Sequence, residues 1–600
     1  MCGITAYVGE GDPVETVLTG LRNLEYRGYD SAGFAVSDGH SVDVVKREGT
    51  VDSLVGEVGN WSWDGEAAIG HTRWSTHGPP TDANAHPHTD CSGDIAVVHN
   101  GIVENYDELR AALVDAGHGF DSETDTEVIP HLVEAELADS DVETAFRTVT
   151  DRLEGSFALT MLHAGSERVY ATRQGSPLVL GVGGDGYYLA SDVPAFLEYT
   201  DEVVYPEDGD VLTVSADGYH IAGPAGRSIE RPHQTVDWAA EDAQKQPYDH
   251  YMKKEIHEQP TAIDQSIRGR LSEAGVELDD LDGVPFADVT DVCFVACGTS
   301  YHAALYGTQL LDERGIPARA VLASEFAASP PETDDRTLVV GVTQSGETAD
   351  TLAALRAARK AGRRTLAVTN VVSSTAAREC ESCLYIRAGP EIGVAATKTF
   401  ASQLTTLLLL AERLAAAAGN GESMSADLRR SLRALPEQVQ TVLDTADAYR
   451  LAETYAGSTA YFFIGRGLAL PVAMEGALKL KEISYEHAEG FAAGELKHGP
   501  LALVTPETPV FAISDGQHTE RTVATVEEVQ ARGAPVVAVG VRDSPVADVA
   551  DSHLPVPGTD PELVGLLANV QLQLFAYHAA RLLDRPVDKP RNLAKSVTVE

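Results

Sequence analysis

Short apolar runs separated by polar turns dominate the first 230 residues, and few of the stretches between them have helical periodicity. Runs of this kind, bounded by glycine, asparagine and aspartate, are typical of β-strands. We therefore predict an α+β sandwich over residues 1–230. Its predicted strands include residues 4–8, 33–36, 95–99, 156–162 and 169–172.

The pattern changes after a polar, proline-containing segment at residues 231–260, which we predict to be a linker. Beyond it, near-continuous apolar runs alternate with glycine- or serine-containing loops and long Ala/Leu-rich helices. Buried parallel strands covered by helices have this pattern. The predicted strands lie at residues 292–296, 337–342, 365–369, 460–465, 510–514 and 536–540.

This second half repeats itself. The segment DVCFVACGTS at 291–300 precedes a predicted helix, and the segment TAYFFIGRG at 459–467 does the same. We predict two similar α/β domains with parallel sheets, at residues 261–435 and 436–590, followed by a tail at 591–600. A single large doubly wound sheet is the alternative.

The charge composition narrows the function classes. The chain of 600 residues has 45 basic and 91 acidic side chains, a net charge of −46. Such a chain repels nucleic-acid phosphates, so we expect no nucleic-acid partner. The acidic residues occur in every segment, which we interpret as adaptation to high salt. We see neither a signal-peptide pattern nor an apolar stretch of membrane-spanning length, and expect a cytoplasmic protein with no membrane partner.

Six cysteines in a chain of this length do not indicate a disulfide framework. Cys380 and Cys383 form a lone C-x-x-C pair. We interpret them as ordinary buried or helix-surface thiols rather than as a metal or redox site.

Cys2 follows the initiator methionine, whose removal leaves a thiol beside a free α-amine. With a pKa of about 8, roughly a tenth of the amine is free base at neutral pH and is able to take the thiol proton. An N-terminal nucleophile of this kind attacks carbonyl groups.

Three further segments suggest what Cys2 attacks. Arg73 lies among hydroxyl side chains and suits bidentate binding of an α-carboxylate. Asn100 and Gly101 offer a side-chain amide and a backbone N–H to an oxyanion. The acidic segment 122–127 supplies carboxylates for an α-ammonium. Together these features fit an amino acid whose side-chain amide is cleaved.

Histidines in the same region raise the alternative of a metal cluster. Their spacing lacks the helical i, i+4 arrangement of common zinc sites, so we predict no metal. The residues concerned are His71, His77, His86, His88 and His99.

The motifs of this half resemble the class II glutamine amidotransferase domain, a family with the N-terminal nucleophile fold. They are CGI at 2–4, YRGYDSAG at 26–33, HTRWSTHG at 71–78, NAHPH at 84–88, HNG at 99–101 and SETDTE at 122–127. The resemblance implies Cys2 as nucleophile and base, with Asn100 and Gly101 as the oxyanion hole. It also implies that glutamine is bound by Arg73, Thr76, His77 and Asp125.

Two loops of the second half each join a predicted strand to a predicted helix, at residues 297–300 and 343–348. Both offer hydroxyls and backbone N–H groups at the positive end of a helix, a cradle that suits a phosphomonoester. Simple helix capping by serine and threonine is the alternative for either loop alone.

A predicted helix over residues 473–486 carries Glu475, Lys479, Glu482 and Glu486 on one face and Ala473, Ala477 and Leu480 on the other. We interpret the charged face as a reactive face, with an exposed helix bearing ion pairs as the alternative. Downstream, His498 lies in a glycine-bounded loop that suits proton transfer.

The second half resembles the sugar isomerase (SIS) domains of amidotransferases that make glucosamine 6-phosphate and glutamate from glutamine and fructose 6-phosphate. The motifs are SGETADTL at 345–352, EGALKLKEISY at 475–485, ELKHGP at 495–500 and LAKSVTVE at 593–600. The resemblance implies ring opening by His498, a Schiff base at Lys595 and proton transfer by Glu482 beside Lys479. It further implies Trp74 as a gate for ammonia, a homodimer and no cofactor. The implied sugar-phosphate contacts are Cys297, Gly298, Thr299, Ser300, Thr343, Gln344, Ser345, Thr348, Val394 and Ala594.

Two positions depart from the family pattern: Thr343 and Ala396 each stand where the family commonly has serine. Thr343 keeps the hydroxyl and Ala396 does not.

Two other functions remain open, an amidotransferase acting on another phosphosugar and a sugar-phosphate sensor. The joint presence of Glu482, His498 and Lys595 favours an enzyme, because a sensor needs none of them.

Overall fold

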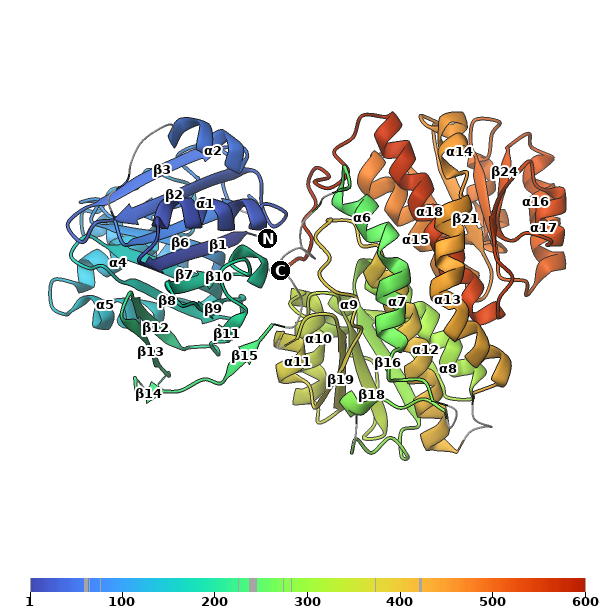
Figure 1. The fold of residues 1–600 in the computed structure, drawn as a ribbon, viewed down its shortest axis with the longest axis horizontal. Helices are drawn as coiled ribbons and strands as arrows, with labels where there is room; N and C mark the ends of the chain where they lie inside the picture. The colour runs from blue at the N-terminus through green and yellow to red at the C-terminus, as the bar shows by residue number, and fades with distance from the viewer. Residues whose placement is uncertain are drawn as a thin grey trace. The chain divides into compact units, whose positions relative to one another are not determined.

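The structure, a computed structural model, describes residues 2–58, 63, 65–75, 77–224, 226–236, 245, 247–272, 275–281, 283–372, 374–419 and 424–598. The chain forms two compact units (Figure 1). The first comprises Met1–Gln244 together with Ala594–Glu600, and the second comprises Lys245–Leu593.

The first unit is built on two antiparallel sheets, which confirms the predicted sandwich. In sheet order, one sheet has β15 (His233–Thr235), β11 (Glu202–Val204), β9 (Val179–Val182), β10 (Gly186–Ala190), β1 (Gly3–Gly9), β4 (Ala67–Arg73), β2 (Ser31–Ser37) and β3 (Val42–Glu48). The other has β14 (Ser228–Ile229), β13 (Gly218–Ala222), β12 (Val211–Ser215), β8 (Val169–Gln174), β7 (Gly155–His163), β6 (Ile95–Val103) and β5 (His88–Thr89).

Apolar side chains from the two sheets form one core between them, with Ile4, Ala96 and Leu212 among its members. Helices α1 (Pro13–Leu24) and α2 (Val51–Val58) pack on the first sheet. Helices α3 (Tyr106–Asp115), α4 (Val128–Glu136) and α5 (Val142–Thr150) share a second core with β6 and β7. Strand β1 lies between the core shared by the two sheets and helix α1, and all of its residues are therefore buried.

The second unit contains two five-stranded parallel sheets of the same topology, so the predicted repeat is confirmed and the single large sheet is wrong. The first has β17 (Ala318–Leu322), β16 (Asp291–Ala296), β18 (Thr337–Val342), β19 (Arg364–Thr369) and β20 (Ser382–Tyr385). The second has β22 (Ala488–Ala492), β21 (Tyr461–Gly465), β23 (Val510–Ser514), β24 (Val536–Val541) and β25 (Ser552–Val556).

The first repeat contains the helices α8 (Gly298–Glu313), α9 (Ala323–Ala328), α10 (Ala349–Lys360), α11 (Thr375–Glu379) and α12 (Lys398–Ala418). The second repeat contains α15 (Ala469–Ser484), α16 (Thr519–Gln530), α17 (Pro545–Val549) and α18 (Pro561–Leu582). Helices α13 (Ala426–Thr445) and α14 (Ala448–Tyr455) join the repeats. Short 3₁₀ segments lie at Val193–Ala195, Asp279–Leu281, Glu495–His498 and Pro500–Leu503. One continuous core runs through both repeats and includes Phe294, Leu408, Leu480 and Phe575.

The segment predicted to be a linker holds regular structure. Strand β15 pairs with β11 in the first unit. Helices α6 (Tyr251–His257) and α7 (Gln259–Ile267) begin within or at the end of the same segment. Residues 237–244, which lie between these elements, are outside the described part of the chain.

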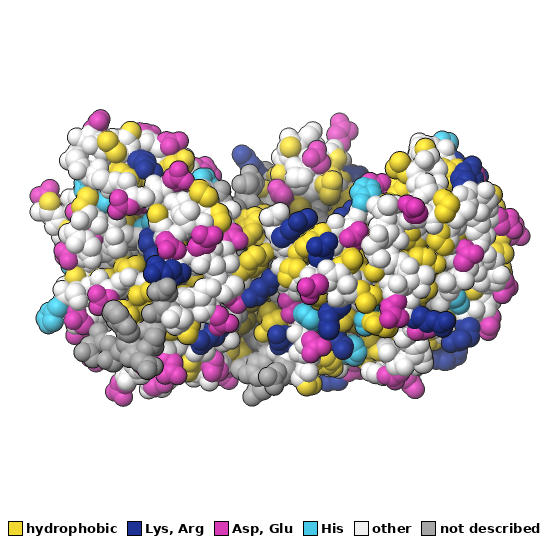
Figure 2. Space-filling model, turned by 90° about the horizontal axis from the view of Figure 1, so that it is seen from above, with side chains coloured by type: hydrophobic (Ala, Val, Ile, Leu, Met, Phe, Trp, Pro, Cys, Tyr) yellow, Lys and Arg dark blue, Asp and Glu magenta, His cyan; other side chains and the backbone are white. Residues whose placement is uncertain are grey.

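By length and composition, one helix in the described part of the chain is apolar enough to cross a membrane. It is α18, and 94% of its apolar window is buried inside the protein. Our expectation that no stretch reaches this length therefore overlooked α18, which packs in the core of the second unit. Acidic side chains are scattered over the face of the protein shown in Figure 2, as the even spread along the sequence predicts.

Candidate active sites

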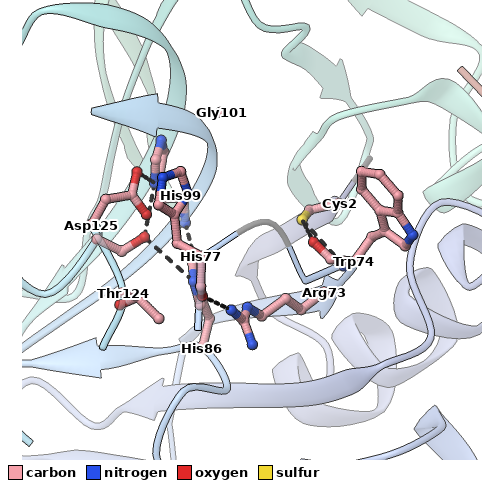
Figure 3. A pocket seen from close by; sticks show the side chains of 10 residues that line it. Cys2, Arg73, Trp74, His77, His86, His99, Gly101, Thr124 and Asp125 are labelled. Carbon is pink, nitrogen blue, oxygen red and sulfur yellow. Dashed lines mark hydrogen bonds and ion pairs between the residues drawn. The ribbon is translucent and has the colours of Figure 1, made fainter. Parts of the chain in front are cut away.

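Cys2 directly precedes β1, and its half-buried thiol contacts Trp74, the residue that follows β4 (Figure 3). The backbone N–H of Trp74 donates to Cys2 Sγ over 3.4 Å, and the thiol lies 3.5 Å from the Trp74 carbonyl oxygen. The backbone carbonyl of Cys2 accepts from Asn100 Nδ2 (3.0 Å) and from Arg27 Nε (3.2 Å). These contacts fix the main chain of the nucleophile and bring Asn100 beside it.

Asn100 and Gly101, which we predict to form the oxyanion hole, lie in the second half of β6. The Asn100 Oδ1 atom lies 3.0 Å from His71 Nε2, which orients the amide with its N–H₂ group toward Cys2. Gly101 has φ +120°, and a Cβ there would lie 1.8 Å from the Ser156 carbonyl oxygen. Only glycine fits this backbone, which keeps the Gly101 N–H close to the pocket.

Arg73, the last residue of β4, is buried and donates to the loop that follows it. Its guanidinium bonds the carbonyl oxygens of His77, Gly78 (3.2 Å) and Pro79 (3.4 Å). Burial lowers the pKa of Arg73, and the neighbouring Cys2, Asp30 and Asp125 act in the opposite direction. Arginine stays charged under such conditions, so the pocket retains a fixed cation with further N–H donors for a carboxylate.

Asp125 supplies the opposite charge. Its Oδ2 atom accepts from the backbone N–H of Val103 (2.8 Å) and lies 4.0 Å from His99 Nδ1. The residue is buried, with 4% of its surface exposed. A carboxylate held in this way suits an α-ammonium.

Four buried histidines, His71, His86, His88 and His99, pack together in this unit, and His86 and His99 line the pocket itself. His71 and His86 stack with ring centroids 4.1 Å apart. Burial lowers the pKa of His71 to about 3 and that of His86, His88 and His99 below the ordinary value, so the rings are neutral. Thr126 Oγ1 lies 2.8 Å from His99 Nδ1, and Thr124 Oγ1 lies 3.1 Å from His88 Nε2. Among the described residues, these histidines do not form a group of converging ligand atoms.

One pocket collects most of the predicted glutamine-site residues (Figure 3). Its lining includes Cys2, Arg73, Trp74, His77, Gly101 and Asp125, together with His86, His99, Thr124 and Thr126. Thr76 lies outside the described residues. Sequence analysis did not assign His86, His99, Thr124 or Thr126 to the glutamine site. All four lie in the motifs quoted above, and membership of these motifs was the signal that could have identified them.

In the second unit, the two hydroxyl loops lie side by side, because β16 and β18 are neighbours in their sheet. Cys297 is the N-cap of α8, and Gly298 has φ +52°. In the other loop, Thr343 Oγ1 accepts from the Gly346 N–H (3.2 Å) and lies 3.2 Å from Thr348 Oγ1. The hydroxyl of Thr343 therefore shapes the loop.

Further contacts order the same loops. Gln344 accepts through its carbonyl from the Asn370 N–H (3.1 Å), and Ser345 Oγ accepts from the Glu347 N–H (3.1 Å). Ser300 Oγ accepts from Gln403 Nε2 (2.9 Å). Both loops present hydroxyls and N–H groups at the start of helices α8 and α10, the arrangement that binds a phosphate.

Helix α15 carries a cluster of buried and half-buried charged side chains. The alternative interpretation, an exposed helix with surface ion pairs, is therefore wrong. Lys479 Nζ lies 2.5 Å from Glu482 Oε2 and 3.5 Å from Glu475 Oε1. Thr299 of the first repeat donates to Glu475 Oε1 (3.0 Å) and accepts from Lys479 Nζ (3.2 Å). This contact joins the phosphate-type loop to the charged helix.

Comparison with known proteins identifies the family. Residues 71–198 match the glutamine amidotransferase domain, and residues 286–413 and 455–583 each match the SIS domain. Glutamine–fructose-6-phosphate aminotransferase (isomerizing) of Halobacterium salinarum is 51% identical over the full length of both chains. The enzyme of the same name from Thermococcus kodakarensis is 47% identical, also over the full length of both.

The chain belongs to the glutamine–fructose-6-phosphate aminotransferase family. Among solved structures, the C-terminal domain of glucosamine–fructose-6-phosphate aminotransferase from Francisella tularensis is similar, with 34% identity and a TM-score of 0.55. The match covers 58% of this chain and all of that one.

Other residues expected from this aminotransferase family lie as follows. His498 is exposed at the end of the 3₁₀ segment Glu495–His498. Val394 and the half-buried Ala396 lie in a loop whose backbone N–H groups at Ile392 and Gly393 both donate to Glu255 Oε1. Ala594 and Lys595 are half-buried in the C-terminal segment, which belongs to the first compact unit. Their approach to a sugar stays a prediction.

Sequence analysis missed His302, whose Nδ1 lies 2.8 Å from Glu475 Oε2. The two residues are far apart in the sequence, so no local pattern indicates the contact. The C-x-x-C thiols behave as expected: burial raises the pKa of Cys380 to about 11 and that of Cys383 to about 12, as for unreactive thiols.

Proposed function

We propose that the protein transfers the amide nitrogen of glutamine to fructose 6-phosphate and so makes glucosamine 6-phosphate and glutamate. The observation that carries the proposal is the position of Cys2 in a pocket that also holds Arg73 and Asp125, with Asn100 hydrogen-bonded to the Cys2 carbonyl. The full-length relatives bear the name of this reaction.

In the glutaminase step, the α-amine of Cys2 takes the thiol proton and the thiolate attacks the side-chain amide carbon of glutamine. Asn100 Nδ2 and the Gly101 N–H stabilise the oxyanion that forms. The C–N bond breaks, ammonia leaves with the proton from the amine, and a thioester remains. Water then hydrolyses the thioester to glutamate and returns the thiol.

In the sugar half, the loops around Ser300 and Thr348 suit the phosphate. His498 opens the furanose ring, and Lys595 forms an imine with the keto group at C2. Ammonia, held back from solvent by Trp74, then replaces Lys595 as the nitrogen at C2. Glu482 moves a proton between C1 and C2, which converts the ketose imine into an aldose amine.

Further proposals concern the location, oligomeric state, cofactor need and salt dependence of the protein. We propose a cytoplasmic homodimer that needs no cofactor and works in high salt. The spread of acidic residues over all segments supports the last point. The exposed position of His498 suits a contribution to the active site of a second copy.

Incubation of the full-length protein with glutamine and fructose 6-phosphate tests the function. We expect glutamate and glucosamine 6-phosphate in equal amounts. The Cys2→Ala variant should lose both products from glutamine yet still bind fructose 6-phosphate. Glutamate without amino sugar from the intact protein would exclude the synthase and favour a sensor with residual glutaminase activity.

A further inference from the structure

A second group of potential metal ligands lies in the first unit, away from the pocket of Cys2. It consists of Cys91, His118, His131 and Glu134, each of which offers one ligand atom, and the four atoms lie within 4.8 Å of one another. The residues come from three separate segments. Cys91 follows β5, His118 follows α3, and His131 and Glu134 lie one turn apart on α4.

The local fold explains how these side chains meet. Gly117 (φ +101°) ends α3 in a left-handed conformation, and the His118 N–H donates to the Leu113 carbonyl (3.0 Å). This helix-ending motif directs the chain back toward α4. On the other side, the Cys91 N–H lies 3.4 Å from Glu134 Oε2 and holds the turn against the same helix.

Four of the six distances between the ligand atoms are close to the edges of a tetrahedral zinc site. Cys91 Sγ lies 3.6 Å from His118 Nδ1 and 3.5 Å from His131 Nδ1. Glu134 Oε2 lies 3.0 Å from His118 Nδ1 and 3.5 Å from His131 Nδ1. A tetrahedral zinc ion, with Zn–S of about 2.3 Å and Zn–N and Zn–O of about 2.0–2.1 Å, sets S–N edges of about 3.6 Å and N–O edges of about 3.3 Å.

We propose that Cys91, His118, His131 and Glu134 form a structural zinc site. Four protein ligands close the coordination shell, as in structural rather than catalytic zinc sites. The thiolate and the carboxylate together balance the charge of the ion. A thiolate with two imidazoles suits zinc, whereas magnesium and calcium take oxygen ligands in higher number.

A hydrogen-bond network explains the arrangement less well. Both imidazoles direct the same nitrogen, Nδ1, at the same sulfur and the same carboxylate oxygen. His131 is buried and packs edge-on against Phe120, and its Nε2 has no hydrogen-bond partner among the described residues. Its ring is therefore committed to the cluster through Nδ1 alone.

The site would tie the turn at Cys91 and the loop at His118 to α4. Helix α4 begins directly after Asp125 and Thr126, which line the glutamine pocket. Zinc would therefore stabilise the frame of the glutaminase unit without contact with the substrate. The proposal departs from the prediction of no metal, which considered histidines nearer to Cys2 and omitted Cys91.

Zinc titration of the full-length protein tests the proposal. The protein is stripped with a chelator and titrated against a chromophoric zinc indicator in molar KCl with excess Mg²⁺, which occupies the surface carboxylates. We expect one tight equivalent per chain. Cys91→Ser should weaken it by at least about 100-fold, since changes outside the ligand shell alone cost about 10–100-fold. Cys383→Ser and Cys2→Ala are controls that should retain the tight equivalent.

Cobalt substitution gives an independent test on the unaltered protein. Bound Co²⁺ should show a thiolate charge-transfer band and the intense visible bands of tetrahedral coordination, and Glu134→Gln, at a partly exposed position, should change the visible bands. The absence of a tight equivalent would overturn the proposal. So would an equivalent that survives in Cys91→Ser, or a Co²⁺ spectrum without the thiolate band.

Discussion

The buried Lys479 and the half-buried Glu482 form an ion pair on α15, with Nζ and Oε2 2.5 Å apart. Burial favours the neutral amine, but Glu482 and Glu475 outweigh it and raise the pKa of Lys479 above its ordinary value. An amine held as an ammonium ion does not attack a ketone. Lys479 therefore suits the role of a fixed positive charge rather than that of a nucleophile, and we expect the imine to form at another lysine.

The first prediction follows from this ion pair. Incubation with fructose 6-phosphate and cyanoborohydride should reduce the imine and attach the sugar to the protein. Peptide mass spectrometry should find the label on Lys595 and none on Lys479. A label on Lys479 would contradict our assignment of the two lysines.

Substitution of Lys479 tests its structural role. Lys479→Met should lower the free energy of unfolding by about 3–5 kcal/mol, because the buried Glu475 and the half-buried Glu482 lose their cation. Urea denaturation measures the change. Lys481→Met, at an exposed position on the same helix, is the matched control and should change stability little.

Gly101→Ala should reduce glutamine hydrolysis by at least about 100-fold, the usual cost of an oxyanion-hole donor. The added Cβ would lie 1.8 Å from the Ser156 carbonyl, so the strand must shift. Release of glutamate from glutamine is the measurement. Gly49→Ala is the control: Gly49 also has positive φ (+99°), yet its nearest neighbour would be Ser53 Oγ at 3.4 Å. Equal losses in both variants would exclude the clash as the cause.

The buried histidines make the stability of the first unit depend on pH. Burial lowers the pKa of His71 to about 3 and holds that of His86 well below the ordinary value, whereas in the unfolded chain both titrate near pH 6.5. Their contribution is therefore fully present above about pH 6.5 and is lost progressively as the pH falls, by about 2 kcal/mol for His71 at pH 5.

Urea unfolding between pH 5 and pH 7 measures this effect. His86→Gln should make the dependence on pH shallower by up to about 2 kcal/mol over that range. His40→Gln, at an exposed position in the same unit, should leave the slope unchanged. An unchanged slope in His86→Gln would show that the ring has the same pKa in the folded and the unfolded chain, which contradicts the effect of burial.

Salt should stabilise the protein. With a net charge of −46, the folded chain repels itself, and the screening length falls from about 10 Å at 0.1 M salt to about 3 Å at 1 M. The free energy of unfolding in urea should rise between dilute and molar KCl. Urea is preferred to guanidinium chloride because the latter is itself a salt. Greater stability in dilute buffer would refute the adaptation to salt.

Strands buried on both faces were predictable from the sequence, whereas edge strands were not. Strand β18 has the predicted bounds because both of its faces are buried and all its positions are apolar or small. Strand β17 was missed: it lies at the edge of its sheet, is partly exposed and contains Arg319. Half-exposed edge strands carry little hydrophobic signal.

Site residues that lie in local motifs were predictable from the sequence, whereas contacts between distant elements were not. Cys2, Arg73 and Asp125 lie in motifs that predict one pocket, and the structure brings them together. The meeting of Cys91 with His118, and of Thr299 with Glu475, depends on tertiary packing between separate elements. No periodicity or local spacing records such contacts.

The hydrogen bond from Thr299 to Glu475 has a consequence for the architecture. One repeat supplies the anion cradle and the other supplies the carboxylates and the ammonium group. Neither repeat is a self-sufficient module. Genetic fission of the chain between α13 and α14 should therefore yield two inert fragments, and turnover should return only when they reassociate.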